Sequence, residues 1–265
     1  MPKIHPSSVV SPKAIIDADV VIDAHCVIED TVKIGAGTHI MSGSVIQNGT
    51  TIGRDNMVHP HVVLGGPPQD LGYHGEPTRL IIGDGNTIRE FVTINRGTTK
   101  ENGETIVGNS NFFMACSHVA HDCVIADKVI MANCVLLAGH VRVGEGATLN
   151  GAVAAHHFTT IGAYAYIGGM AKVRIDVPPY MVADGDPARP KKCNEVGLKR
   201  NGFSDEAIAA LSNAFKKVFR TDKPLVEAVE DLKNIEGEEV KRLREFLENM
   251  IHGKHGRFLE SLREH

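Results

Sequence analysis

No segment of this 265-residue sequence approaches the roughly 18 consecutive apolar residues that a membrane-spanning helix needs. The N-terminal segment, MPKIHPSSVVSPKAIIDADVVID, lacks the basic region, the unbroken apolar stretch and the small-residue cleavage site of a secretory signal. We therefore expect a cytoplasmic protein with no stable membrane insertion.

Charge of one sign is also scarce. The formal net charge is −4, and no long basic or acidic run occurs. Proteins that bind nucleic acid or anionic lipid through phosphate groups need clustered basic residues. The sequence indicates neither class, and we expect no nucleic-acid partner.

Cysteine is too sparse to organise the fold. There are five cysteines, an odd number, and no C-x-x-C pair, which fits neither a disulfide framework nor a zinc ribbon. A reducing compartment is the simplest explanation. Cys116 and Cys134 are 18 residues apart, and we interpret them as filler of the repeat described next.

The dominant feature of the sequence is a period of six residues. An aliphatic residue stands at every sixth position from Ile4 to Leu64, and the apolar pattern resumes from Val107 to Val173 after a shift of one residue. Neither a helix nor an alternating strand has this period. It predicts a mainly β fold, a parallel β-helix with three short strands in each 18-residue coil and coils about 4.8 Å apart.

Two interruptions of the period predict loops that leave the β-helix, at about 66–79 and 95–105. Both segments are polar and rich in glycine, and the first would place Asp70 and Glu76 at buried positions if it stayed in the coil. The repeats end near 176–190, and Ser204 then precedes a helical pattern as a candidate N-cap. We expect a β-helix over 1–190 and an α-helical domain over 191–265.

The 18-residue coil predicts which side chains stack. Gly139 should lie directly above His121, with its backbone N–H open to a ligand, and His140 should lie above Asp122. His157 should lie two coils above His121. One edge of the β-helix is therefore expected to carry several imidazoles and a carboxylate.

Three interpretations of this edge remain open. The histidines decorate a repeat that accepts most polar residues, or they bind a metal, or His121 acts as a general base. A metal needs imidazoles that converge at about 2.0–2.1 Å, and His118 and His121 occupy different parts of the coil, which disfavours a site within one chain. We favour the general base, because a base, an orienting carboxylate and an N–H donor coincide.

The segments HVAHDC, LAGHV, GEPTRLIIGDGNTIREFVTINRGT and VPPYMVADGDPARP closely resemble the acyl-carrier-protein-dependent UDP-N-acetylglucosamine O-acyltransferases that begin lipid A synthesis. The resemblance extends over nearly the whole chain. It implies left-handed coiling, a homotrimer with clefts between neighbouring prisms, and no metal or other cofactor. It also implies that acyl carrier protein supplies the acyl chain and UDP-N-acetylglucosamine accepts it.

The resemblance also assigns roles to residues. His121 would be the general base, Asp122 its neighbour, and Gly139 the donor to the oxyanion. Gly169 would limit the length of the acyl chain, and a glycine there predicts a long one. The other substrate-binding residues that the resemblance implies are Gln69, Asp70, His118, His140, His156, His157, Asn194 and Arg200.

Some positions depart from the family pattern. A lysine often found two places after the loop aspartate is Gly72 here, and a usual arginine pair is Arg200-Asn201, which leaves the diphosphate contacts open. A frequent histidine is Asn95, and Val196 replaces a common glutamate.

Three related activities remain as alternatives. The sister N-acyltransferase of the pathway typically carries an extra N-terminal domain, for which repeats beginning at Ile4 leave no room. The others are a coenzyme A-dependent sugar acetyltransferase and a metal-dependent carbonic anhydrase with hexapeptide repeats.

Overall fold

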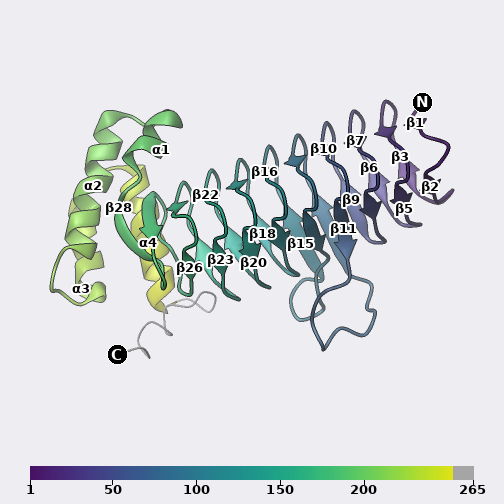
Figure 1. The fold of residues 1–265 in the computed structure, drawn as a ribbon. Coiled ribbons are helices and arrows are strands. Elements are labelled where there is room, and N and C mark those ends of the chain that lie inside the picture. Colours follow the sequence, from purple (N-terminus) through teal and green to yellow (C-terminus); the bar gives the residue numbers. More distant parts are fainter. Residues whose placement is uncertain (253–265) are drawn as a thin grey trace.

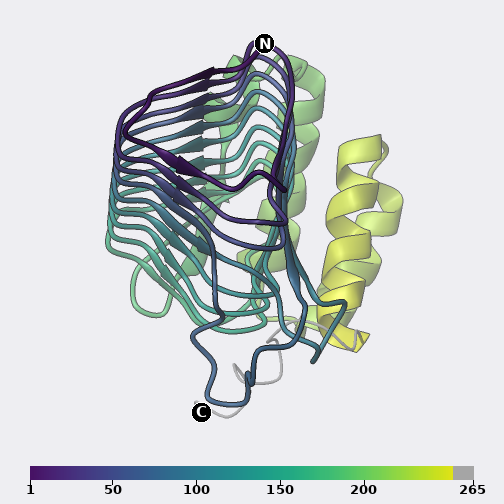
Figure 2. The same ribbon diagram turned by 90° about the vertical axis from the view of Figure 1, so that its right-hand side faces the viewer.

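The repeats form a triangular prism whose three faces are parallel β-sheets. The structure, a computed structural model, describes residues 1–252. Figure 1 shows the coils stacked side by side along the prism, and Figure 2 shows its triangular profile from one end. The predicted left-handed parallel β-helix with a C-terminal helical region is confirmed. Residues 253–265, the end of the expected helical domain, lie outside the described residues.

Each face is one sheet, here called sheet A, B or C in the order in which the chain first enters them. Sheet A contains β1 (Lys3–Ile4), β4 (Val21–Ile22), β7 (His39–Ile40), β10 (Met57–Val58), β13 (Thr87–Ile88), β16 (Phe112–Phe113), β19 (Ile130–Met131), β22 (Thr148–Leu149), β25 (Tyr166–Ile167), β27 (Met181–Asp184) and β28 (Arg189–Cys193). Sheet B contains β2 (Val9–Val10), β5 (Val27–Ile28), β8 (Val45–Ile46), β11 (Val63–Gly66), β14 (Thr93–Asn95), β17 (His118–Val119), β20 (Leu136–Leu137), β23 (Ala154–Ala155) and β26 (Lys172–Val173). Sheet C contains β3 (Ile15–Ile16), β6 (Lys33–Ile34), β9 (Thr50–Ile52), β12 (Arg79–Ile82), β15 (Glu104–Val107), β18 (Val124–Ile125), β21 (Arg142–Val143) and β24 (Thr160–Ile161).

The register follows the predicted coil length except where a loop is inserted. Lys3 pairs with Val21, and His118 pairs with Leu136, so uninterrupted coils stack residues 18 apart. Two segments between strands leave this frame: 67–78 joins β11 to β12, and 96–103 joins β14 to β15. We call them the first loop and the second loop.

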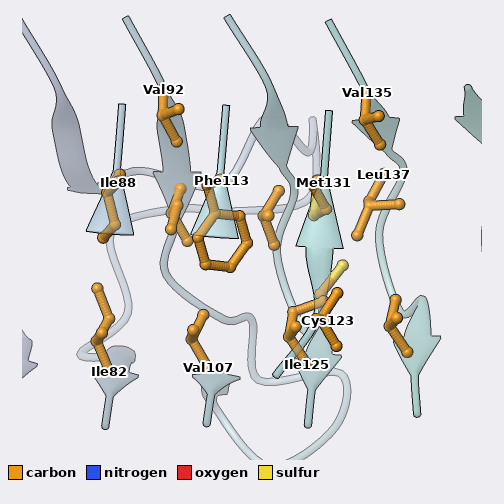
Figure 3. Close-up of a cluster of buried hydrophobic side chains, with 14 of the residues drawn as sticks. Ile82, Ile88, Val92, Val107, Phe113, Cys123, Ile125, Met131, Val135 and Leu137 are labelled. Atoms are coloured by element: carbon orange, nitrogen blue, oxygen red, sulfur yellow. The ribbon is translucent and has the colours of Figure 1, made fainter. Parts of the chain in front are cut away.

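The interior of the prism is filled by apolar side chains from the strands and by smaller side chains from the corners, some of which are apolar and some polar. Figure 3 shows such side chains from all three sheets pointing toward one another, among them Ile88, Ile125 and Leu137. Cys26 and Cys123 belong to this core, whereas Cys116 and Cys134 are exposed. The interpretation of the latter two as interior filler was therefore wrong, because both lie at a corner with positive φ, where the side chain points to solvent.

A column of buried asparagines runs through three successive coils. Asn86 donates from its amide to Asn56 Oδ1 at 3.0 Å and to the Gly108 carbonyl at 3.0 Å. Its own Oδ1 accepts the Asn111 backbone N–H at 2.8 Å. The amides thus tie neighbouring coils together inside the prism, where an unpaired polar group would be costly.

The helical region covers the C-terminal end of the prism (Figure 1). Its elements are α1 (Glu195–Arg200), α2 (Asp205–Phe219), α3 (Leu225–Glu230), the 3-10 helix η1 (Asp231–Asn234) and α4 (Glu238–His252). Ser204 caps α2 by accepting the Ala207 backbone N–H, as the sequence predicted. Leu211, Leu243 and Tyr180 belong to a second apolar core beneath these helices. Within residues 1–252, none of the helices is long and apolar enough to span a membrane.

Candidate active site

The two loops and most of the predicted site residues share one edge of the prism, where the chain passes from sheet B to sheet C. We call it the B–C edge. His121 and Asp122 follow β17 at this edge, Gly139 and His140 follow β20, and His157 follows β23. Both loops also leave between a strand of sheet B and a strand of sheet C, and they project together from one side of the profile in Figure 2. The inserted segments therefore fold beside the stacked histidines.

His121 and Asp122 form a buried hydrogen-bonded pair. The imidazole Nδ1 lies 2.8 Å from Asp122 Oδ2, and the residues are only 5% and 2% exposed. The contact places the ring proton on Nδ1, because an ionised carboxylate can only accept. The other nitrogen, Nε2, is then a free acceptor of a proton.

Asp122 is fixed by the second loop. Thr98 donates its backbone N–H to Oδ1 at 2.7 Å and its hydroxyl to Oδ2 at 2.6 Å. Burial works to raise the pKa of Asp122, but the hydrogen bonds from His121 and Thr98 outweigh it and hold this pKa below its usual range. The carboxylate therefore stays ionised beside the imidazole.

The second loop also covers His121. A corner position predicts a side chain that points outward, yet Thr98 and its neighbours fold over this corner and leave the residue 5% exposed. No periodicity identifies Thr98, since it stands where the repeat is broken.

Gly139 stacks on His121 as the 18-residue coil predicted. A Cβ at Gly139 would stand 2.5 Å from Cε1 and 2.8 Å from Nε2 of the imidazole. The Gly139 N–H donates no hydrogen bond within the part of the chain that the structure describes. A glycine here therefore leaves a backbone donor beside the nitrogen that can accept a proton.

His140 lies above Asp122, again as predicted. Its Nε2 is 3.7 Å from Asp122 Oδ2, and its Nδ1 is 3.2 Å from Glu101 Oε1 in the second loop. Its ring stacks on Phe158 at 4.3 Å between centroids and meets the His121 ring edge-on at 5.2 Å. The packing holds this imidazole against both carboxylates.

A metal ion has one possible donor set among the described residues. Ligand atoms of His121, Asp122 and His140 all lie within 4.8 Å of one another. His118 is not part of the group, in line with the expectation that it occupies a different part of the coil. In this arrangement Nδ1 of His121 is already engaged by the carboxylate at 2.8 Å, so a metal that binds at Nδ1 would have to displace that proton. That the protein needs no metal remains a prediction.

The other predicted histidines lie close to this pair. His118 faces outward from sheet B, and its Nδ1 is 2.7 Å from the Thr93 hydroxyl. Partial burial lowers the pKa of His118. The pKa of His157 is lowered by the part of its ring that is covered and by the charges of the neighbouring imidazoles. The His156 and His157 rings contact each other edge-on at 5.4 Å. His118 and His157 are therefore held toward the neutral form.

The first loop contributes Gln69, which is exposed, and Asp70. Asp70 accepts the Gly72 N–H at 2.8 Å on Oδ1 and lies 2.5 Å from Lys100 Nζ on Oδ2. The hydrogen bond from Lys100 is the main cause of the lowered pKa of Asp70, and the charge of His121 adds to it. Asp70 therefore lies within electrostatic reach of the His121 imidazole.

Three predicted residues do not lie with this group in one chain. Gly169 follows β25 of sheet A and so occupies a different edge from His121, because 48 residues is not a whole number of 18-residue coils. Asn194 caps α1 and donates to the Tyr164 carbonyl at 2.9 Å, and Arg200 ends α1. A single site containing all of them requires more than one copy of the chain.

Similar proteins agree with the fold and with the residue pattern. Residues 31–66 match the family of bacterial transferase hexapeptides, and 176–256 match the second domain of UDP-N-acetylglucosamine O-acyltransferase. The acyl-[acyl-carrier-protein]–UDP-N-acetylglucosamine O-acyltransferase of Gloeothece citriformis is 44% identical over 199 residues, 75% of this chain and 72% of that protein.

Solved structures extend the similarity to almost the full length. The structure of LpxA from Acinetobacter baumannii has a TM-score of 0.90 and 37% identity over 93% of this chain and 96% of that one. The UDP-N-acetylglucosamine O-acyltransferase of Moraxella catarrhalis has a TM-score of 0.90 and 38% identity, with the same coverage of 93% and 96%. The end of the prism and its helical cap are therefore shared, not only the repeat.

Proposed function

Because this chain belongs to the family of the acyl-carrier-protein-dependent UDP-N-acetylglucosamine O-acyltransferases, we propose that it catalyses the first step of lipid A synthesis with His121 as general base. It moves a (3-hydroxy)acyl chain from acyl carrier protein to the 3-position of UDP-N-acetylglucosamine. One observation carries this proposal. Gly139 stacks on His121, and His121 is hydrogen-bonded to Asp122 beside it.

The geometry supports a direct transfer. Nε2 of His121 takes the proton from the sugar 3-hydroxyl, and that oxygen attacks the carbonyl carbon of the thioester. The carbonyl oxygen becomes an oxyanion, which the Gly139 N–H stabilises. When the intermediate collapses, the C–S bond breaks and the thiolate takes the proton from His121. Asp122 holds the imidazole in position and stabilises the imidazolium.

An acidic acyl carrier protein is the proposed donor. Lys216 and Lys217 are exposed in the last turn of α2, whereas Lys223 pairs with Asp231 at 2.6 Å. Exposed basic residues attract an acidic partner and speed its approach. A donor with coenzyme A alone, and a metal-dependent hydratase, are not favoured by the relatives that name acyl carrier protein.

The active form is proposed to be a homotrimer in the cytoplasm. Gly169, Asn194 and Arg200 lie away from the B–C edge of their own chain, so clefts between neighbouring prisms would bring them to a shared substrate. The five free cysteines support a reducing compartment. No cofactor takes part in the proposed chemistry.

One assay tests the activity. Purified protein is offered UDP-N-acetylglucosamine with either hydroxyacyl carrier protein or the corresponding acyl-coenzyme A, and products are identified by mass. We expect acylated UDP-sugar with the carrier protein and little or none with coenzyme A. Equal transfer from both donors, or no transfer from either, would reject the proposed donor.

A further inference from the structure

The second loop brings a lysine to the B–C edge that no pattern in the sequence identified. Lys100 lies two residues after Thr98, which is bonded to Asp122. Its Nζ lies 2.5 Å from Asp70 Oδ2 in the first loop. The ammonium group therefore stands between the two loops, beside the groups that position the base.

Lys100 also occupies the space beside Gly72. A Cβ at Gly72 would stand 3.3 Å from Lys100 Nζ and 3.5 Å from its Cε. The φ of Gly72 lies outside the left-handed region, so the backbone would accept a side chain there. The ammonium group of Lys100, which belongs to the second loop, thus occupies the space that a side chain at position 72 of the first loop would enter.

The pairing with Asp70 orients Lys100 without using all of its donors. An ammonium group has three N–H donors, and Asp70 Oδ2 occupies one. The Lys100 side chain is still 54% exposed, whereas that of Asp70 is 15% exposed. The free donors of Lys100 therefore face solvent at the edge where the acceptor must bind.

The acceptor of the proposed reaction is a sugar nucleotide whose diphosphate is attached one sugar ring away from the hydroxyl that reacts. When that hydroxyl meets Nε2 of His121, the diphosphate must lie along the same edge, near the loops. A flexible cation with two free donors is well matched to a phosphate oxygen.

We propose that Lys100 binds the diphosphate of the sugar-nucleotide acceptor. This inference rests on the proposed function. It makes Lys100 a substrate-binding residue whose contribution is to acceptor affinity and not to proton transfer.

The first experiment compares Lys100→Met with the wild type. The KM for UDP-N-acetylglucosamine should rise about 10- to 100-fold, the loss expected for one hydrogen bond to a charged group. The KM for the acyl donor and kcat should change less than about threefold, because the thioester and His121 do not contact Lys100. Lys13→Met is the control, since Lys13 forms a similar exposed pair with Asp30 at 2.8 Å near the N-terminus.

A second experiment asks whether the cation itself matters or only the link between the loops. UDP and uridine are used as competing ligands, and Asp70→Asn is compared with Lys100→Met. A phosphate contact predicts that Lys100→Met weakens UDP binding but not uridine binding, and that Asp70→Asn, which keeps the cation, weakens UDP binding less than Lys100→Met does. Equal losses of UDP binding in both variants would show that the pair only joins the loops, and would overturn the proposal.

The third experiment moves the cation. In the Lys100→Met background, Gly72→Lys should restore the KM for the acceptor to within about threefold of wild type, given one recovered charged contact. An acceptor KM in Lys100→Met that equals the wild-type value overturns the proposal while leaving the proposed function intact. A wild-type enzyme that does not use UDP-N-acetylglucosamine at all would instead reject the proposed function.

Discussion

Gly139 lies one coil above His121, so near that a Cβ at position 139 would stand 2.5 Å from Cε1 of the imidazole. Gly139→Ala should therefore push the ring of His121 away from its place beside Asp122. A displacement of this size at a reacting group costs on the order of 100-fold in kcat. Steady-state kinetics with both substrates saturating measures it.

The backbone at Gly139 does not require glycine, since its φ lies outside the left-handed region. The loss in Gly139→Ala should thus appear in kcat without a fall in thermal stability of more than a few degrees. Gly151→Ala is the matched stability control, because Gly151 occupies the equivalent corner position and its added Cβ would meet its nearest neighbour at 3.6 Å. An unaffected kcat in Gly139→Ala would contradict the stacking account.

In the proposed mechanism, Thr98 acts through Asp122 as a positioning residue. Thr98→Val keeps the shape and the backbone N–H but removes the hydroxyl that donates to Asp122 Oδ2. We expect kcat to fall roughly 10-fold, as for a lost hydrogen bond to a charged group, with little change in either KM. Thr98→Ser should restore kcat, and a failure of serine to do so would assign the loss to packing alone.

The lowered pKa of Asp122 predicts how stability depends on pH. Because its folded pKa lies below the unfolded value of about 3.9, the ionised carboxylate contributes stability that is present above that value and is lost as the pH falls through the folded pKa. The difference in unfolding free energy between wild type and Asp122→Asn should therefore shrink when the pH is lowered from 6 to 3. Urea unfolding at several pH values tests this, and a constant difference would contradict it.

The buried asparagine column predicts that replacing Asn86 lowers the free energy of unfolding. Asn86→Val leaves the buried Asn111 N–H without its partner. Asn56 Oδ1 loses the amide donor of Asn86 but keeps the backbone N–H of residue 86. An orphaned buried donor costs about 1–3 kcal/mol, so the free energy of unfolding should fall by about 1–3 kcal/mol. Val129 occupies the next place in the same column, where its N–H bonds to Asn111 Oδ1, which shows that valine itself fits the geometry. Unchanged urea unfolding of Asn86→Val would show that the column does not stabilise the coils.

The repeat predicts which residues of this site lie next to one another, although they are far apart in the sequence. A fixed 18-residue coil is enough to place Gly139 on His121 and His140 on Asp122, because stacking in a β-helix follows from counting along the chain. The same counting separates Gly169 from His121, since the number of residues between them does not complete a coil. Cys116 and Cys134 were placed wrongly. Their separation of 18 residues shows only that they stack, and their position within the six-residue repeat, which decides whether a side chain points inward, was not considered.

The loops set the limit of prediction. Their boundaries are visible as breaks in the period, but an irregular segment has no register from which a contact can be counted. The bonds from Thr98 to Asp122 and from Lys100 to Asp70 join segments that only the folded chain brings together. The burial of His121 follows from the same loop, which is why a corner position alone suggested an exposed ring.

The most direct test of the account is the turnover of His121→Ala, measured with hydroxyacyl carrier protein and UDP-N-acetylglucosamine and read by product mass. Loss of a general base predicts a fall in kcat of roughly 10²–10⁴-fold, in protein whose thermal unfolding shows that the prism is intact. Turnover near the wild-type value in His121→Ala would contradict the assignment of this residue as the base.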